Sequence, residues 1–170
     1  DISSHDGIFY IVNSGVQCGG NFVIAAKNPA GPWSNPVWLP FDGIEPSIFW
    51  DGDTAYIVNN GAPDETPRYE GHRAIWMQAF DWRTLKLVGP RTQIVNGVVD
   101  LSKKPIWIEG PHLLKRDGRY YLIAAEGGTS DNHSEVVFRA DSVDGPYVPF
   151  PGNPILTQRT LDPSRANPVT

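Results

Sequence analysis

The chain has little of what would crosslink a fold, bind nucleic acid or cross a membrane. Its 170 residues include one cysteine, Cys18, so no disulfide can form within the chain. The longest basic run is Lys103–Lys104 and the formal net charge is -5, so the concentrated positive field of a nucleic-acid groove is missing. No apolar stretch approaches the roughly 20 residues that span a bilayer. We therefore expect neither nucleic acid nor a membrane as a partner.

Glycine, proline and aromatic residues are plentiful. The 17 glycines and 16 prolines are scattered along the chain, and 40% of the residues are hydrophobic, including six Trp, six Tyr and seven Phe. Frequent punctuation between short apolar runs is typical of many β-strands joined by tight turns. No segment has a convincing helical pattern. The composition predicts an all-β domain with enough apolar material for a core.

A repeat runs along the chain. Three segments open with a carboxylate, continue through a short apolar run, turn at Asp-Gly and resume with an aromatic strand: Asp1–Val12, Glu45–Val58 and Glu109–Ile123. Asp-Gly between apolar runs predicts a hairpin, since a type I′ turn needs positive φ at both central residues. A second element, Ala26–Trp33, recurs as Ala140–Tyr147. The repeating unit is therefore a hairpin, a third strand, a turn and an outer strand.

The spacing of this unit favours a β-propeller. The opening carboxylates are 44 and 64 residues apart, near the spacing of four-stranded blades with variable loops. We predict a partial propeller over 1–170, with about three blades at 1–40, 41–100 and 101–170. An antiparallel sandwich with three Asp-Gly hairpins is the alternative, because short strands at regular spacing suit both architectures.

The acidic residues that open the repeats are the first candidates for chemistry. In a propeller the first strand of each blade lies along the central channel, so Asp1, Glu45 and Glu109 should converge there. Carboxylates held close together raise one another's pKa, and glycoside hydrolysis needs one carboxylic acid that stays protonated. The alternative is that each acid only caps a strand or binds a backbone N–H.

Two longer motifs resemble a known family. The stretch 108–122, followed by 125–129, is similar to the segment of glycoside hydrolase family 43 that carries the general acid, which implies that role for Glu109. The stretch 43–51 resembles the blade whose carboxylate orients the acid and tunes its pKa. The family usually has Asp there, and this chain has Glu45. The opening stretch 1–7 resembles the start of the second blade.

The resemblance implies a five-bladed propeller of which this chain forms roughly blades two to four. The general-base Asp is then expected upstream of Asp1, and a His that organises the active centre is expected beyond Thr170. The remaining blades would be the partners of this segment, which by itself should be inactive. We expect no required cofactor, although an ion such as calcium would suit the channel of the complete propeller. No His or Cys cluster here has metal-ligand spacing, so we predict no metal within the segment.

The implied activity is inverting hydrolysis of pentose glycosides, namely the xylosides or arabinofuranosides of plant hemicellulose. Inversion needs acid and base carboxyls roughly 6.5–9.5 Å apart, which leaves space for the attacking water. The sequence leaves xylose and arabinose both open. A non-catalytic carbohydrate-binding propeller is the alternative function, and a protein-interaction propeller is a third.

Several further residues have weaker signals. Trp107 lies two residues before Glu109, on the same face of a regular strand, and would stack on a sugar or pack within a blade. His133 falls where the family tends to place a His near the sugar pocket, and Asp1 is a further candidate substrate contact. We expect Glu126 to brace a loop. Three others are interpreted as structural: Asn59, Asn60 and His112.

Overall fold

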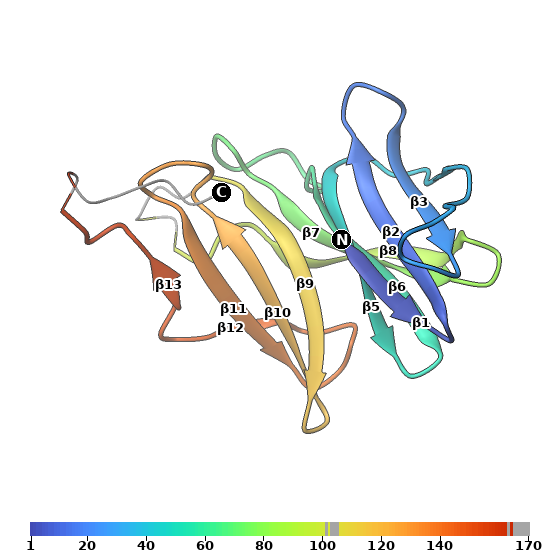
Figure 1. The fold of residues 1–170 in the computed structure, drawn as a ribbon. Coiled ribbons are helices and arrows are strands. Elements are labelled where there is room, and N and C mark those ends of the chain that lie inside the picture. Colours follow the sequence, from blue (N-terminus) through green and yellow to red (C-terminus); the bar gives the residue numbers. More distant parts are fainter. Residues whose placement is uncertain (101, 103–105, 163, 165–170) are drawn as a thin grey trace.

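The computed structural model describes residues 1–100, 102, 106–162 and 164, which form three antiparallel sheets (Figure 1). The first sheet contains β1 (Ile2–His5), β2 (Ile8–Gly15), β3 (Gly20–Ala26) and β4 (Val37–Trp38). The second contains β5 (Ile44–Asp51), β6 (Thr54–Gly61), β7 (Ala74–Asp81) and β8 (Lys86–Asn96). The third contains β9 (Ile108–Arg116), β10 (Arg119–Glu126), β11 (Ser134–Ala140) and β12 (Val148–Pro149), with β13 (Leu156–Thr157) also paired to β11.

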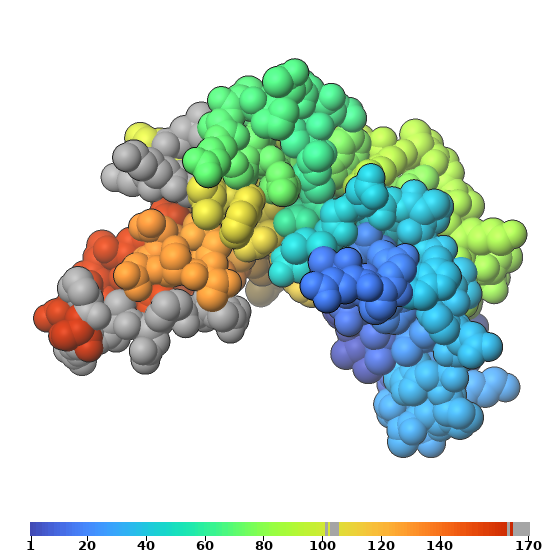
Figure 2. Space-filling view, turned by 90° about the horizontal axis from the view of Figure 1, so that it is seen from above, coloured from blue at the N-terminus to red at the C-terminus, as the bar shows by residue number. Residues whose placement is uncertain are grey.

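The sheets are successive blades of a propeller. Each is a meander in which neighbouring strands in sequence are neighbours in the sheet. Seen from above, the sheets lie side by side in an arc around a hollow (Figure 2). A sandwich consists of two packed sheets, whereas here three sheets follow one another around an arc, so the all-β propeller prediction is confirmed and the sandwich is excluded. No helix in the described part of the chain is long and apolar enough to cross a membrane.

The middle sheet is buried on both faces. One core lies between the first and second sheets and contains Val12, Val23 and Ile57, all at most 2% exposed. The other lies between the second and third sheets and contains Val58 and Leu122, both at 0%. Because successive residues of a strand point to opposite faces, burial of both faces requires a continuous apolar run, and β6 has one.

Two of the three tight turns have the predicted geometry. Asp6 and Gly7 have φ of 49° and 74°, and Asp117 and Gly118 have φ of 52° and 73°, as a type I′ turn requires. The second hairpin differs, since Asp51 pairs with Thr54 and is the last residue of its strand. Its turn is Gly52–Asp53, in which only Gly52 has positive φ.

This difference changes how the repeats correspond. The pairs that flank the turns are His5 with Ile8, Asp51 with Thr54, and Arg116 with Arg119. Counting back along each inner strand from these pairs places Asp1 level with Ser47 and His112. Glu45 and Glu109 lie closer to the N-terminal ends of their strands. Both are beside register shifts, in the pairings of β5 with β6 and of β9 with β10. The three acids therefore do not occupy equivalent positions.

Candidate active site

Two of the three acids meet at the boundary between the second and third sheets. Glu45 is the second residue of β5, and Glu109 is the second residue of β9. An oxygen of the Glu45 carboxylate, Oε2, accepts a hydrogen bond from the backbone N–H of Gly110 at 2.7 Å. Glu45 is thereby fixed against the strand that carries Glu109. The longer side chain of Glu45 reaches this N–H directly.

The surroundings of Glu109 favour its protonated form. Burial of the half-exposed side chain raises the pKa of Glu109, and the negative charge of Glu45 raises it further. His133 and Arg73 act in the opposite direction and lower the same pKa. The net shift is upward, as a carboxylic acid that donates a proton near neutral pH requires.

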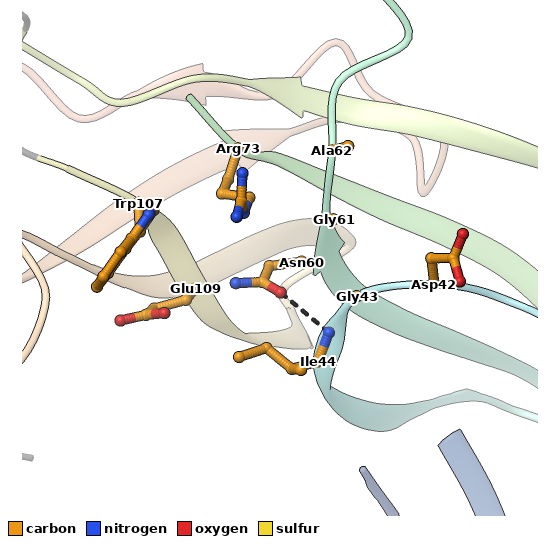
Figure 3. A pocket seen from close by; sticks show the side chains of 9 residues that line it. All are labelled: Asp42, Gly43, Ile44, Asn60, Gly61, Ala62, Arg73, Trp107 and Glu109. Carbon is orange, nitrogen blue, oxygen red and sulfur yellow. Dashed lines mark hydrogen bonds between the residues drawn. The ribbon is translucent and has the colours of Figure 1, made fainter. Parts of the chain in front are cut away.

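Glu109 lines a cavity of about 380 Å³ (Figure 3). Trp107 and Glu109 border it from the start of β9 and Arg73 from just before β7, whereas Ile44 and Asn60 come from β5 and β6. The remaining lining residues come from the linker before β5, from the last residue of β6 and from the residue after it: Asp42, Gly43, Gly61 and Ala62. An aromatic wall, a cation and a carboxylic acid around one cavity are suited to a sugar and its hydroxyl groups.

Trp107 lies at the rim of this cavity with 39% of its surface exposed. It precedes β9 and has φ of 48°, so the regular-strand argument that placed it on the face of Glu109 does not apply. Its backbone N–H donates to the carbonyl of Gly71 at 3.0 Å. A side-chain carbon added at Gly71 or Gly128, both of which have positive φ, would lie 3.2–3.3 Å from the indole, closer than ordinary van der Waals contact.

Arg73 is the functional candidate that the sequence reasoning missed. Its Nη1 donates to the carbonyl of His72 at 3.2 Å, and no other hydrogen bond of this guanidinium is found among the described residues. The side chain is half-buried and borders the same cavity as Glu109. Its only sequence signal is its place, directly before the third strand of the blade, β7, and after the Gly71 turn.

The other sequence candidates lie nearby in different settings. His133 is 13% exposed at its side chain, and its Nδ1 lies 2.9 Å from the carbonyl oxygen of Gly128. Asp1 is exposed, and its Oδ2 accepts the backbone N–H of Ile48 on β5 at 3.1 Å. No described contact joins Asp1 to Glu45 or Glu109, so the structure brings together two of the three acids.

Glu126 has the bracing contacts expected of it. The side chain is buried, and its Oε2 accepts the backbone N–H of Val99 at 3.1 Å. Its other oxygen lies 3.6 Å from Nη2 of Arg159. Glu126 thus anchors the backbone at Val99, just after the second sheet. Within the described ranges, no group of three or more His, Cys, Asp or Glu side chains is arranged to hold a metal ion.

Comparison with known proteins decides the family. The model of glycosyl hydrolases family 43 matches residues 1–170. The chain belongs to this family. A xylosidase/arabinosidase of Butyrivibrio fibrisolvens is 45% identical over 164 residues, which are 94% of this chain and 31% of that protein. A putative β-xylosidase of Escherichia coli is 37% identical over 92% of this chain and 30% of its own length.

Solved structures of the family have the same fold. The crystal structure of a GH43_12 protein from a capybara gut metagenome superposes with a TM-score of 0.86 at 45% identity, covering 94% of this chain and 31% of that one. A xylan β-1,4-xylosidase from Bacillus halodurans gives 0.76 at 36% identity, with the same coverage. The family 43 chain described here thus spans about a third of the length of these relatives.

Proposed function

We propose that this chain supplies the proton donor of a pentosidase that cleaves xylosides or arabinofuranosides with inversion. The observation that carries the proposal is the Glu45–Glu109 pair, in which a carboxylate fixed by Gly110 N–H faces a half-buried carboxylic acid at a cavity. The names of the relatives support the substrate class. They include a xylan 1,3-β-xylosidase of a Vibrio species and a non-reducing-end α-L-arabinofuranosidase of Bacteroides ovatus.

In the proposed reaction Glu109 gives its proton to the oxygen that leaves with the departing sugar. The bond from the anomeric carbon to that oxygen breaks while a water attacks from the opposite face, and a base outside this chain takes the proton of the water. Glu109 ends as a carboxylate. Glu45 keeps the acid protonated beforehand through its charge and does not itself transfer a proton.

The cavity residues support binding of the sugars. We assign the exposed indole of Trp107 as a stacking surface and Arg73 as a donor to sugar hydroxyls, since both border the cavity of Glu109. His133 contacts the carbonyl of Gly128, and we assign it the role of orienting the loop that includes Gly128. Asp1 is proposed to contact substrate from the exposed start of the first inner strand. No step is assigned to a metal ion.

The assignment of Glu109 is tested with Glu109→Gln in the intact protein. Loss of general acid catalysis is expected to lower turnover of an unactivated xylobiose or arabinofuranoside by about 10²–10⁴-fold. A nitrophenyl glycoside should lose much less, because its leaving group needs little protonation. Glu70→Gln, which changes an exposed carboxylate, is the matched control. Turnover of the unactivated substrate near the wild-type rate would reject Glu109 as the acid.

The same experiment addresses the binding alternative. A non-catalytic carbohydrate-binding propeller would bind xylo-oligosaccharides and hydrolyse neither class of substrate, in the wild type as well as in Glu109→Gln. Binding without any wild-type turnover would therefore replace the hydrolase proposal.

A further inference from the structure

Residues 41–44 form the linker that leads into Glu45. Side chains from other elements make a hydrogen bond to the backbone of each of these four residues. Nδ2 of Asn21 donates to the carbonyls of Phe41 and Gly43, at 2.9 and 3.0 Å. Nδ2 of Asn59 donates to the carbonyl of Asp42 at 3.0 Å. The backbone N–H of Ile44 donates to Oδ1 of Asn60 at 3.1 Å. We call this set of contacts the linker clamp.

The final contact of the clamp is made by Ser14. Its hydroxyl oxygen accepts the backbone N–H of Glu45 at 3.1 Å and donates to Oδ1 of Asn21 at 2.6 Å. Ser14 and Asn21 are directly paired residues of β2 and β3. One continuous path of hydrogen bonds therefore runs from the first sheet, through Glu45, to Gly110 on the third sheet.

Glu45 needs such support because its backbone is strained. Its φ is 54°, a region that costs a residue with a side chain about 1–3 kcal/mol. Gly43 also has positive φ, and a side-chain carbon there would overlap the carbonyl oxygen of Asn60. A strained conformation persists only where surrounding contacts determine it, and the clamp provides those contacts.

The burial of the clamp residues indicates that they are not simply surface polar groups. Asn21, Asn59 and Asn60 are 2–3% exposed. A buried amide is stable only if its donors and acceptor are paired, and these amides are paired largely with the linker. An apolar side chain at these positions could also be buried in the blades, but it could not hold the backbone of the linker that leads into Glu45.

We propose that Ser14 and Asn21 are positioning residues of the first sheet, which place the Glu45 carboxylate on Gly110 N–H and so beside Glu109. The proposal rests on the function proposed above, and neither residue touches the substrate. The charged groups that act on Glu109 are Glu45, His133 and Arg73. Of these three, Glu45 is the one that hydrogen bonds among the described residues connect to the clamp.

The test uses Ser14→Ala in the intact protein. Removing the hydroxyl frees the N–H of Glu45, so the carboxylate loses its fixed place. We expect kcat on unactivated xylobiose to fall about tenfold to a hundredfold with KM unchanged, since misplacement of catalytic groups by about 1 Å costs up to this much. The basic limb of the pH profile should move to lower pH. The nitrophenyl substrate should be affected far less.

Two further variants separate positioning from stability. Ser14→Thr keeps a hydroxyl and should retain the wild-type profile. Ser34→Ala removes a hydroxyl from the loop between β3 and β4, which accepts Ala25 N–H and donates to the carbonyl of Asn35, and which makes no hydrogen bond to the linker clamp among the described residues. This control should leave the pH profile unchanged, whatever its effect on the melting temperature. An unshifted profile and full kcat in Ser14→Ala, with Glu109→Gln inactive, would overturn the positioning role alone. Activity in Glu109→Gln would instead overturn the acid assignment.

Discussion

At the scale of single residues, the site depends on an unequal pair of glutamates. Glu109 is half-buried and its pKa is raised chiefly by burial, whereas Glu45 is exposed and anchored to a backbone N–H. The two glutamates thus differ in their surroundings, and in the proposed reaction they take different roles for that reason. His133 and Arg73 act against this rise and lower the pKa of Glu109.

Glu45→Gln tests the electrostatic part of this arrangement. The amide oxygen can still accept Gly110 N–H, but the negative charge that raises the pKa of Glu109 is lost. In the proposed reaction activity requires protonated Glu109, so it should fall as pH rises through the pKa of this residue. The basic limb of kcat/KM should therefore shift to lower pH, while burial keeps the limb above the range of an ordinary glutamate.

The measurement is a pH–rate profile of the intact protein between pH 4 and 9, with Glu70→Gln as the control. A basic limb in Glu45→Gln that coincides with the wild-type limb would show that the charge of Glu45 has no influence on the acid.

The residue types at the site were more predictable than their placement. The motif around Glu109 and the stretch 43–51 indicated both glutamates, and the structure brings the two together. The repeat also suggested Asp1 as their equivalent. It lies level with Ser47 instead, because extra residues in the inner strands shift Glu45 and Glu109 and no composition signal marks such a shift. Arg73 was missed because one arginine before a strand carries no pattern.

At the scale of elements, neighbouring sheets are joined by polar contacts as well as by their cores. Asp51, the last residue of β5, accepts hydrogen bonds from Lys115 Nζ at 2.8 Å and from Tyr120 O–H at 2.6 Å. Both partners belong to the third sheet. These bonds join the C-terminal end of β5 to the third sheet. Glu109 lies at the other end of β9.

Asp51→Asn should weaken this junction in a pH-dependent way. The hydrogen bonds from Lys115 and then Tyr120 hold the pKa of Asp51 below its ordinary value of 3.8. Because the folded-state pKa is depressed, the contribution to stability is present above the unfolded pKa and is lost as pH falls through the folded one. We expect Asn to lower the free energy of unfolding by about 1–2 kcal/mol at pH 7.

Urea unfolding of the intact protein at pH 7 and below pH 3.5 measures this effect, and the difference between wild type and Asp51→Asn should shrink at the lower pH. Asp117→Asn is the control, since Asp117 is 91% exposed at its side chain and lies in a turn that suits Asn. An equal loss in the two variants at pH 7 would mean that the junction contributes nothing.

The strands themselves were largely predictable, because Asp-Gly turns and alternating apolar residues are local signals. The linker clamp was not. Asn59 and Asn60 were interpreted as structural without a partner, and Ser14 and Asn21 carried no signal. Their partners are backbone groups 16–31 residues away along the chain, and such contacts have no sequence periodicity.

At the scale of the whole molecule, the first and third sheets each leave one apolar face uncovered. On the first sheet the directly paired residues Ile2, Ile11 and Ile24 lie on the face away from the second sheet. On the third sheet Ile123 and Val137 form the equivalent row. Faces of this kind are normally buried in a propeller, so we propose that further blades cover both.

A charge placed on such a face tests the proposal in the intact protein. Ile123→Lys should lower the free energy of unfolding by about 2–4 kcal/mol if a blade covers the sheet, because the ammonium would be buried without a partner. Ser142→Lys, at an exposed position of the following loop, is the control and should change stability by less than about 0.5 kcal/mol. A similarly small change in Ile123→Lys would indicate an open face.

The path of hydrogen bonds from Ser14 to Gly110 has a consequence for protein engineering. The proposed acid Glu109, the neighbouring carboxylate Glu45 and the serine that accepts its backbone N–H lie on three different sheets. Exchanging a single blade between homologues would combine one of these residues from one protein with the other two from another protein. The three would then not have evolved together, and their positions would not match. Chimeras of this enzyme family should therefore keep their activity when residues 1–126 are transplanted as one block.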